Sequence, residues 1–593
     1  MKLRIESRGE GEMMESHKEI ETDVLIIGSE AAGARAAIEL SDKNLNVLMV
    51  TKSVMAKSAV TVKAVFSVSG AFGFADPRDN PEVHFQDTVE AGRYLNNQKL
   101  AEIVTSEGPK RLDELGKWGV KWDKAPDGRY LQVKMYGHTY ARSLSVGFRV
   151  GLEWMRILKK EVAKRPRITV KNDVFVTNYL KSKRGEVSGA FAIDIRTGDL
   201  WVIKAKAVLD TTGGGMYLYR TNSGTPESTG DGYAMGYRAG AELTDMEFVQ
   251  FYPIQMYYPP TLKEDQGTPA FVRTFLRGKL YNFYGERFMR RYDAEHMELA
   301  DRDVLARAIF MEIKQGRGTP HGGVWLDASY LPDKIIESVI DKMAPNWTLR
   351  GINLPKYGID LRKDPLEVGP VAHFFCGGIK VDERWETGIP GYFVAGEVVG
   401  GANGANRLPG NALEETQVSA VIAANSAAEY AQKILHTQID REQIDVEKAR
   451  VLRVFENPPG GARPGALIRE LRHIMWDNVG ILRTGKELEE AIDKIGHMRT
   501  EAFPRVVIPL QSRVFNRDWI ESLELSNMLD VAEMITRAAS LRTESRGCHY
   551  RHDFPKPSRE WLKNIYIRKE DAKMILKPEP VVVTKIPLPL EEA

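Results

Sequence analysis

The stretch DVLIIGSEAAGARAAIEL, residues 23–40, constrains the fold more than any other part of the chain. Its apolar run at 24–27 is typical of a buried parallel strand, Gly28 ends that run, and the following residues favour a helix. A second apolar run, NVLMVTK at 46–52, completes a strand–helix–strand unit of about 30 residues. The pattern predicts the start of a doubly wound domain with a dinucleotide site at its first turn.

The glycine turn in this unit departs from the G-x-G-x-x-G fingerprint. Gly28 and Gly33 stand where the first and last glycines belong, but Glu30 takes the middle position, where the backbone approaches a pyrophosphate. A carboxylate facing phosphates is unfavourable. We therefore expect Glu30 to turn its carboxylate away from the phosphates, or to meet a cation such as Lys52 or a nearby arginine.

Composition excludes several classes of protein. The 593 residues are too many for one core, so two to four domains are expected, and a net charge of +2 gives no case for nucleic-acid binding. No run of 18 apolar residues occurs, and no secretory signal is evident. The two cysteines, Cys376 and Cys548, are too few for a disulfide framework or an iron–sulfur cluster, and they favour a reducing, cytoplasmic setting. Cys376 is expected to be a packing residue or a reactive thiol.

The order of patterns along the chain predicts its domains. Alternating residues and turn signals at 168–215 favour antiparallel hairpins, and a second strand-then-glycine signal at 391–397 precedes an Ala-rich helix. Two nucleotide-fold signals so far apart bracket an inserted domain. The expected parts are a disordered lead-in (1–21), a nucleotide-binding domain in two pieces (22–253 and 371–437), a capping domain (254–370), a helical domain (438–545) and an extended tail (546–593).

Seven motifs occur in one fixed order: TTGGG (211–215), STGDGYAMGYRAGAEL (228–243), DMEFVQFYP (245–253), AHFFCGGIKVD (372–382), GYFVAGEVVGGANGANRLPGNALEE (391–415), IMWDNVGILRTG (474–485) and ESRGCHYRHDFP (544–555). Together they resemble the flavoprotein subunit of the succinate dehydrogenase/fumarate reductase family, to which L-aspartate oxidase and adenylylsulfate reductase are related. The resemblance covers about residues 22–560. It implies an α/β fold: a Rossmann-like FAD-binding domain interrupted by an inserted α+β capping domain and followed by a C-terminal helical domain.

The resemblance also implies FAD and the residues that bind it. The expected cofactor-binding residues are Gly28, Ser29, Ala32, Gly33, Thr51, Lys52, Gly213, Asp231, Glu397, Asn411 and Leu413. Plain turns are the alternative for the glycines, and a helix cap is the alternative for Asp231. No metal site is expected.

Many relatives bond FAD covalently to a histidine just after the second strand. In this chain no histidine occurs between His17 and His84, and Val60 aligns with that position. Because valine has no nucleophile, we expect FAD to be held without a covalent bond.

By the same resemblance, Arg302 in LADRDVLARAIF is the proton donor to a dicarboxylate, and Arg277 is a second catalytic arginine. His373 and Arg407 match the residues that bind the substrate carboxylates, a task that suits arginine forks. An arginine is a poor acid at its usual pKa above about 12, so the role of Arg302 rests on the resemblance.

Two positions depart from the family pattern. Tyr252 stands where the family has a substrate histidine, and Thr274 stands where it has a glutamate that relays protons. Threonine cannot relay a proton as a carboxylate does. The departures favour a changed substrate, another small carboxylic acid, while fumarate and succinate stay open.

The sequence thus predicts an FAD-dependent oxidoreductase subunit that moves a hydride between flavin N5 and a C–C bond of a small carboxylic acid. With only two cysteines, it needs an iron–sulfur protein as its electron partner, and that partner can place it at the inner face of the membrane. The alternatives are chemistry like that of L-aspartate oxidase or adenylylsulfate reductase, and a non-catalytic electron-transfer flavoprotein.

Overall fold

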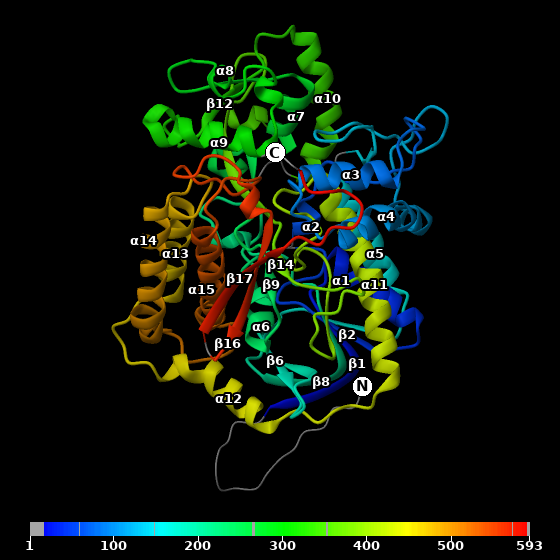
Figure 1. Cartoon of the computed structure of the whole chain (residues 1–593), viewed down its shortest axis with the longest axis vertical. Coiled ribbons are helices and arrows are strands. Elements are labelled where there is room, and N and C mark those ends of the chain that lie inside the picture. The colour runs from blue at the N-terminus through cyan, green and yellow to red at the C-terminus, as the bar shows by residue number, and fades with distance from the viewer. Residues whose placement is uncertain are drawn as a thin grey trace.

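A seven-stranded sheet forms the base of the molecule in the computed structural model, which describes residues 17–57, 60–147, 149–263, 267–350, 354–571 and 573–589 (Figure 1). Its strand order is β5-β2-β1-β8-β7-β6, and β15 also pairs with β8. The strands are β1 (Lys18–Ile27), β2 (Val47–Val50), β5 (Ile168–Lys171), β6 (Val174–Lys181), β7 (Val187–Asp194), β8 (Leu200–Asp210) and β15 (Tyr392–Val394).

The first strand–helix–strand unit folds as predicted. β1 lies between β2 and β8 and is parallel to both, so its residues 24–27 are buried on both faces, as a continuous apolar run requires. Helices α1 (Ala31–Asp42), α5 (Val150–Ala163) and α11 (Asn411–Lys433) pack together beside this sheet (Figure 1). The second nucleotide-fold segment thus returns to the first: β15 joins the sheet and α11 packs on α1.

The turn between β1 and α1 needs both of its glycines. Gly28 has φ +106°, and a Cβ on it would lie 2.4 Å from the Thr211 carbonyl oxygen. A Cβ on Gly33 would lie 2.1 Å from the carbonyl oxygen of Gly28. The helix therefore starts in direct contact with the end of the strand, which is the close packing that the glycine spacing predicts.

The predicted hairpins at 168–215 form in part. β6, β7 and β8 are an antiparallel meander, whereas β5 pairs in parallel with β2. Between β2 and α5 the chain forms α2 (Val60–Lys63), β3 (Val68–Ser69), α3 (Pro81–Ala91), α4 (Gln98–Trp118) and β4 (Ser143–Leu144).

The capping region lies at the top of Figure 1 and has its own apolar core. Its sheet has the order β10 (Val249–Tyr258), β13 (Leu366–Phe375), β12 (Val324–Asp327) and β11 (Lys279–Tyr281). Its helices are α7 (Gly267–Phe275), α8 (Met289–Tyr292), α9 (Arg302–Glu312) and α10 (Asp333–Arg350). β10 and β13 extend beyond the predicted insertion at 254–370 on either side, and they connect the capping region to the rest of the chain.

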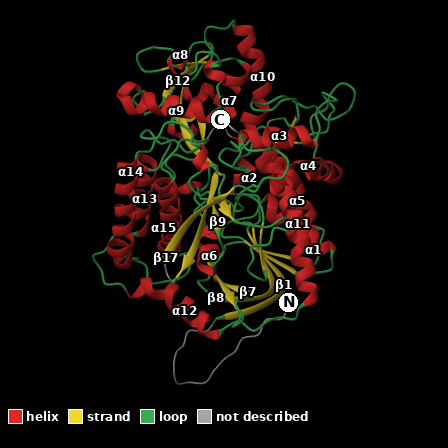
Figure 2. Cartoon of the chain, in the orientation of Figure 1, coloured by secondary structure: helices red, strands yellow, loops and turns green. Residues whose placement is uncertain are grey.

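The predicted helical domain is present beside the sheet (Figure 2). It contains α12 (Arg441–Leu452), α13 (Pro464–Asn478), α14 (Gly485–His497) and α15 (Arg517–Leu541). α15 packs against α13, α14 and α6 (Asp231–Ala239), which brings the helical domain to the nucleotide-binding side. None of the helices among the described residues combines the length and the apolar character that a membrane crossing requires.

Two predictions about the chain ends are wrong where the structure describes them. Residues 18–21 belong to β1; residues 1–16 lie outside the described residues. The tail is not simply extended, because β16 (Lys563–Glu570) and β17 (Lys573–Pro580) form an antiparallel hairpin. β16 pairs with β9 (Leu243–Thr244), which also pairs with β14 (Gly378–Ile379), so the tail completes a four-stranded sheet.

Candidate active site

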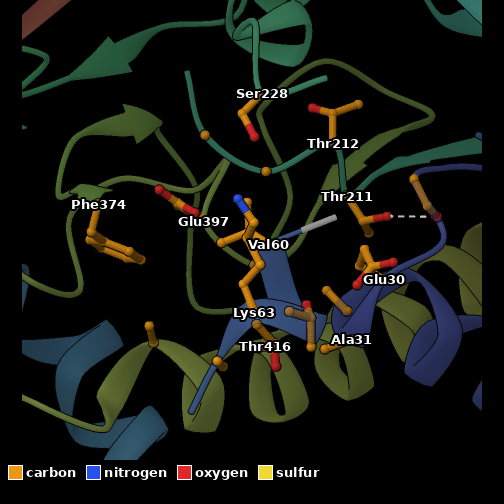
Figure 3. Close-up of a pocket in the computed structure, with 18 of the residues that line it drawn as sticks. Glu30, Ala31, Val60, Lys63, Thr211, Thr212, Ser228, Phe374, Glu397 and Thr416 are labelled. Atoms are coloured by element: carbon orange, nitrogen blue, oxygen red, sulfur yellow. Dashed lines mark hydrogen bonds between the residues drawn. The ribbon is translucent and has the colours of Figure 1, made fainter. Parts of the chain in front are cut away.

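A long pocket of about 1820 Å³ of empty space, counting its open mouth, lies where the carboxyl ends of β1, β2 and β8 meet the capping strands. Figure 3 shows Glu30 and Thr211 on one side of it and Phe374 on the other. We call the part lined by residues 28–32, Thr51, Lys52 and Asp231 the dinucleotide end. We call the part lined by Tyr252, Arg302, His373 and Arg407 the arginine end.

Most residues expected to bind the cofactor line this pocket: Gly28, Ser29, Ala32, Thr51, Lys52, Gly213, Asp231, Glu397 and Leu413. Gly213 has φ +77°, and a Cβ on it would meet open space. Glu30 Oε2 and Glu227 Oε2 are buried without a hydrogen-bond partner among the described residues. An elongated pocket at the start of α1, with open backbone and polar atoms left for a ligand, fits an FAD molecule.

Gly33 and Asn411 lie outside the pocket lining. Gly33 acts behind the turn, through its contact with Gly28. The Asn411 side chain is fully buried and turned away: its amide nitrogen donates to Thr88 Oγ1 (3.0 Å), and its oxygen lies 2.9 Å from His84 Nε2. Asn411 therefore fixes the start of α11 against α3, and its side chain does not face the cofactor space.

Lys52 is held by two carboxylates, one of which the sequence did not indicate. Its Nζ donates to Asp231 Oδ2 (2.6 Å) and to Glu524 Oε1 (2.9 Å). Asn527, which lies on α15 together with Glu524, donates to Asp231 Oδ1 (2.8 Å). Burial opposes the charge of Lys52, but the two carboxylates raise its pKa above the ordinary value. Glu524 and Asn527 are buried polar residues in α15, and that burial, visible only in the fold, is their one distinguishing signal.

Glu30 does not meet the cation that we expected. Lys52 is engaged by Asp231 and Glu524, and the groups near the Glu30 carboxylate are the Ala56 N–H and the Thr61 hydroxyl. Burial raises the pKa of Glu30 to about 7, although these two donors lower it. The turn therefore tolerates its acid because burial keeps a large share of the Glu30 carboxyl protonated, and so uncharged, up to about pH 7.

Val60, the residue at the position of the family's linking histidine, faces the pocket from α2 (Figure 3). Its neighbour Lys63 also lines the pocket and donates to the carbonyl oxygen of Gly224 at 2.7 Å.

The arginine end brings together four predicted residues from four segments. Tyr252 lies on β10, His373 on β13, Arg302 at the start of α9, and Arg407 in the loop before α11. The Arg302 guanidinium carbon lies 5.5 Å from the centre of the Tyr252 ring, and the Tyr252 and His373 rings are 5.3 Å apart. The structure thus gathers residues that are 155 positions apart in sequence, from Tyr252 to Arg407, around one small space.

Neighbouring side chains fix these groups. Arg407 donates to Gln250 Oε1 (3.0 Å) and to the Leu408 carbonyl (3.2 Å), and His373 Nδ1 lies 2.9 Å from Ser223 Oγ. Among the described residues, Arg302 Nε and Nη1 and Arg407 Nε are buried with no hydrogen-bond partner. Buried guanidinium donors without partners are costly unless an anion completes the site.

The positive charges of Arg302, Arg407 and protonated His373 repel one another at the arginine end. Burial, and then the charge of Arg407, lowers the pKa of Arg302 to about 9. Burial and both arginines lower the pKa of His373 well below its ordinary value, so its imidazole is neutral at neutral pH. A neutral histidine and two cationic forks suit the binding of an anionic carboxylate.

The structure places Arg277 and Thr274 outside the pocket. α7 ends at Phe275, and Arg277 follows with φ +53° and an exposed side chain. Thr274 is half-buried on the same helix. Arg273 is instead buried, lies 4.7 Å from the centre of the Tyr136 ring, and adds positive charge near Arg302. Arg273 does not line the pocket either; the helix end, which the sequence pattern did not predict, decides which of the two arginines is buried.

Comparisons with known proteins assign the chain to a family. Residues 23–413 match the FAD binding domain family, and residues 468–593 match the fumarate reductase flavoprotein C-terminal family. An uncharacterised FAD-dependent oxidoreductase of Methanocaldococcus jannaschii is 41% identical, over 93% of this chain and 96% of its own. A fumarate reductase (CoM/CoB) subunit of Methanothermobacter marburgensis is 40% identical, over 93% of this chain and 97% of its own.

Solved structures agree over nearly the whole chain. Sdh1 of Mycobacterium smegmatis superposes with a TM-score of 0.87 at 34% identity, covering 96% of both chains. FrdA of the E. coli quinol fumarate reductase gives a TM-score of 0.87 at 30% identity, covering 96% of this chain and 98% of its own. L-Aspartate oxidases are 31–32% identical over about 90% of this chain. The chain belongs to the succinate dehydrogenase/fumarate reductase flavoprotein family, and it is an FAD-dependent oxidoreductase.

Proposed function

We propose that this chain reduces the C=C bond of a small unsaturated dicarboxylic acid, with fumarate as the first candidate. The observation that carries the proposal is the set of buried, unpartnered guanidinium donors that Arg302 and Arg407 present beside a neutral His373. FAD, when bound and reduced, would supply a hydride to one carbon of such a bond. The name of the M. marburgensis relative supports fumarate as a candidate.

The residues of the arginine end divide the work. Arg407, held by Gln250, binds one carboxylate of the substrate, and His373 donates a hydrogen bond to it. Arg302 gives a proton to the carbon next to the one that receives the hydride. Its pKa, lowered to about 9, makes it a stronger acid than an ordinary arginine. Buried Arg273, and not the exposed Arg277, assists Arg302 from outside the pocket, since its charge adds to this lowering.

Tyr252 makes the wall near β10 different from the family pattern. A phenol is neutral where the resemblance places a histidine, so the second carboxylate meets less positive charge there. We therefore propose that other unsaturated dicarboxylic acids related to fumarate are also substrates.

The proposed reaction requires bound FAD and a partner that supplies electrons to it. We propose that FAD is held without a covalent bond, supported by Val60 at the linking position. We propose an iron–sulfur protein as the electron partner, supported by the two cysteines of the chain and by the naming of the M. marburgensis relative as one subunit of a reductase.

The test is product formation by the reduced holoprotein. Protein with reduced flavin is mixed, without oxygen, with a panel of unsaturated mono- and dicarboxylic acids, and the saturated products are counted. The proposal predicts one saturated product per flavin with a dicarboxylic acid and little with the matching monocarboxylic acids. Equal yields from monocarboxylic acids, or no product from any acid, would contradict it.

A further inference from the structure

The dinucleotide end of the pocket has no acid directly after β2. Dinucleotide-binding folds commonly place an Asp or Glu there, and its carboxylate accepts a hydrogen bond from the ribose of the adenosine half. In this chain the position is Thr51, which lines the pocket. A carboxylate accepts hydrogen bonds more strongly than a threonine hydroxyl does, so the same recognition calls for an acid from another segment.

Asp231 lines this end of the pocket, but the protein already uses its carboxylate. Its Oδ2 accepts from Lys52 at 2.6 Å. Its Oδ1 accepts from Thr229 at 2.9 Å and from Asn527 at 2.8 Å. Both oxygens of Asp231 therefore have donors from the chain itself, which leaves little acceptor capacity for a ligand.

Glu30 lines this end too and keeps a buried Oε2 without a partner among the described residues, but it stands elsewhere. It lies in the glycine turn between β1 and α1, which is where the pyrophosphate of a dinucleotide meets the fold. The ribose of such a cofactor lies nearer the end of the following strand. Glu30 is therefore placed at the phosphates and not at the ribose.

Glu227 is the acid of this pocket that lies beside the end of β2. Its carbonyl oxygen accepts from the Thr229 N–H at 2.9 Å. The Thr229 hydroxyl in turn accepts at 2.7 Å from Lys52, the residue after Thr51. The Glu227 side chain lines the pocket, and its Oε2 is buried with no hydrogen-bond partner among the described residues. A buried acceptor of this kind is costly unless a ligand supplies a donor.

We propose that Glu227 binds the ribose hydroxyls of the adenosine half of FAD, in place of the acid that other dinucleotide folds carry after their second strand. The hydroxyls donate, and the carboxylate accepts. A site built to pair with a hydroxyl rejects a ligand that lacks it, because a buried polar group is then left unpaired. The dinucleotide end therefore selects a ribose, whichever acid the arginine end reduces.

The experiment titrates the full chain, freed of FAD, with FAD and with an analogue that carries 2′,3′-dideoxyadenosine. Quenching of flavin fluorescence reports binding. We expect the wild type to bind the analogue about tenfold more weakly than FAD. We expect Glu227→Ala to bind FAD about tenfold more weakly than the wild type does, and to bind the two ligands within about twofold of one another.

The comparison of the two ligands separates ribose binding from a structural role. A structural role of Glu227 would weaken both ligands equally and keep the wild-type ratio between them. Glu30→Gln is the matched control, because it changes another acid of the same end of the pocket. We expect this variant to keep the preference of about tenfold for FAD over the analogue.

Two results would overturn the inference. One is a wild type that binds the analogue as tightly as FAD. The other is a Glu227→Ala variant that keeps the full preference for FAD. If FAD stays attached to the unfolded chain, the proposal of non-covalent FAD fails. Protein produced without riboflavin is then titrated with ADP and 2′,3′-dideoxy-ADP by calorimetry, and the same two results decide.

Discussion

The two ends of the pocket treat their buried cations in opposite ways. At the dinucleotide end, Lys52 is saturated by Asp231 and Glu524, so the protein completes its own network. At the arginine end, Arg302 and Arg407 keep buried donors that no described residue accepts. The first arrangement is a seat in which the cation is neutralised by the chain itself. The second holds charge that only an anionic ligand can complete.

Breaking the network at the dinucleotide end gives the largest expected effect. Lys52→Met removes the cation shared by the buried Asp231 and Glu524. Among the described cations it leaves only Arg517, 3.6 Å from Glu524, so the change costs about 3–5 kcal/mol of folding free energy. We expect release of FAD at a markedly lower temperature, followed by flavin fluorescence during heating.

Two variants sharpen this expectation. Lys18→Met removes a half-exposed partner of Asp199 and should cost less than about 1 kcal/mol. Adding Glu524→Gln to Lys52→Met should restore part of the loss, because one uncompensated carboxylate disappears. If Lys18→Met and Lys52→Met lowered stability equally, the buried network around Lys52 would not be what stabilises the dinucleotide end.

The arginine end should respond in ligand affinity and not in stability. Arg407→Ala removes the fork to which we assign the substrate carboxylate, so we expect the dissociation constant for fumarate to rise by about 100-fold with FAD still bound. The measurement is a titration read by flavin absorbance.

Arg277→Ala is the matched control, because Arg277 is exposed beyond the end of α7. We expect it to change fumarate affinity by less than about twofold. A loss of affinity comparable to that of Arg407→Ala would restore Arg277 to the site and contradict the placement of Arg273.

The smallest expected effect is a pH dependence of FAD affinity that comes from Glu30. Because burial raises its pKa to about 7, the folded chain holds its proton more tightly than the unfolded chain does. Its contribution to stability is therefore present below its ordinary pKa of 4.5 and is lost as the pH rises through about 7. Ionised Glu30 also repels phosphate, so FAD affinity should fall by about tenfold as the pH rises past 7.

Equilibrium dialysis of FAD against pH tests this expectation. Glu30→Gln should abolish the pH dependence, while Glu227→Gln, which changes another acid of the same pocket, should retain it. A pH profile that Glu30→Gln leaves unchanged would show that the acid in the glycine turn does not govern binding.

Local sequence patterns predicted correctly those elements, such as β1, in which every residue has the same degree of burial. The run at 24–27 is apolar throughout because β1 is covered on both faces. Positions 28 and 33 require glycine because a Cβ there would lie only 2.4 or 2.1 Å from a carbonyl oxygen. The sequence did not predict the hairpin of β16 and β17, because Pro578 and Pro580 favoured an extended tail. β17 is the edge strand of its sheet, and an edge strand accepts proline.

The site shows the same division. Residues within motifs, such as His373 and Arg407, could be assigned from the resemblance, and the structure brings them to the pocket. Glu524 could not be found, because its partner Lys52 is 472 positions away and nothing local in α15 indicates that contact. Arg273 and Arg277 could not be told apart, since a shift of four residues past a helix end reverses which one is buried.

The rate at which fumarate reoxidises the reduced flavin tests the central claim most directly. It is measured in stopped flow without oxygen, for the wild-type protein and for Arg302→Ala with equal FAD content. Because Arg302 is assigned as the proton donor, we expect rapid reoxidation in the wild type and a rate about 1,000-fold lower in the variant. A wild type that fumarate does not reoxidise, or a variant that reacts as fast as the wild type, would contradict the account.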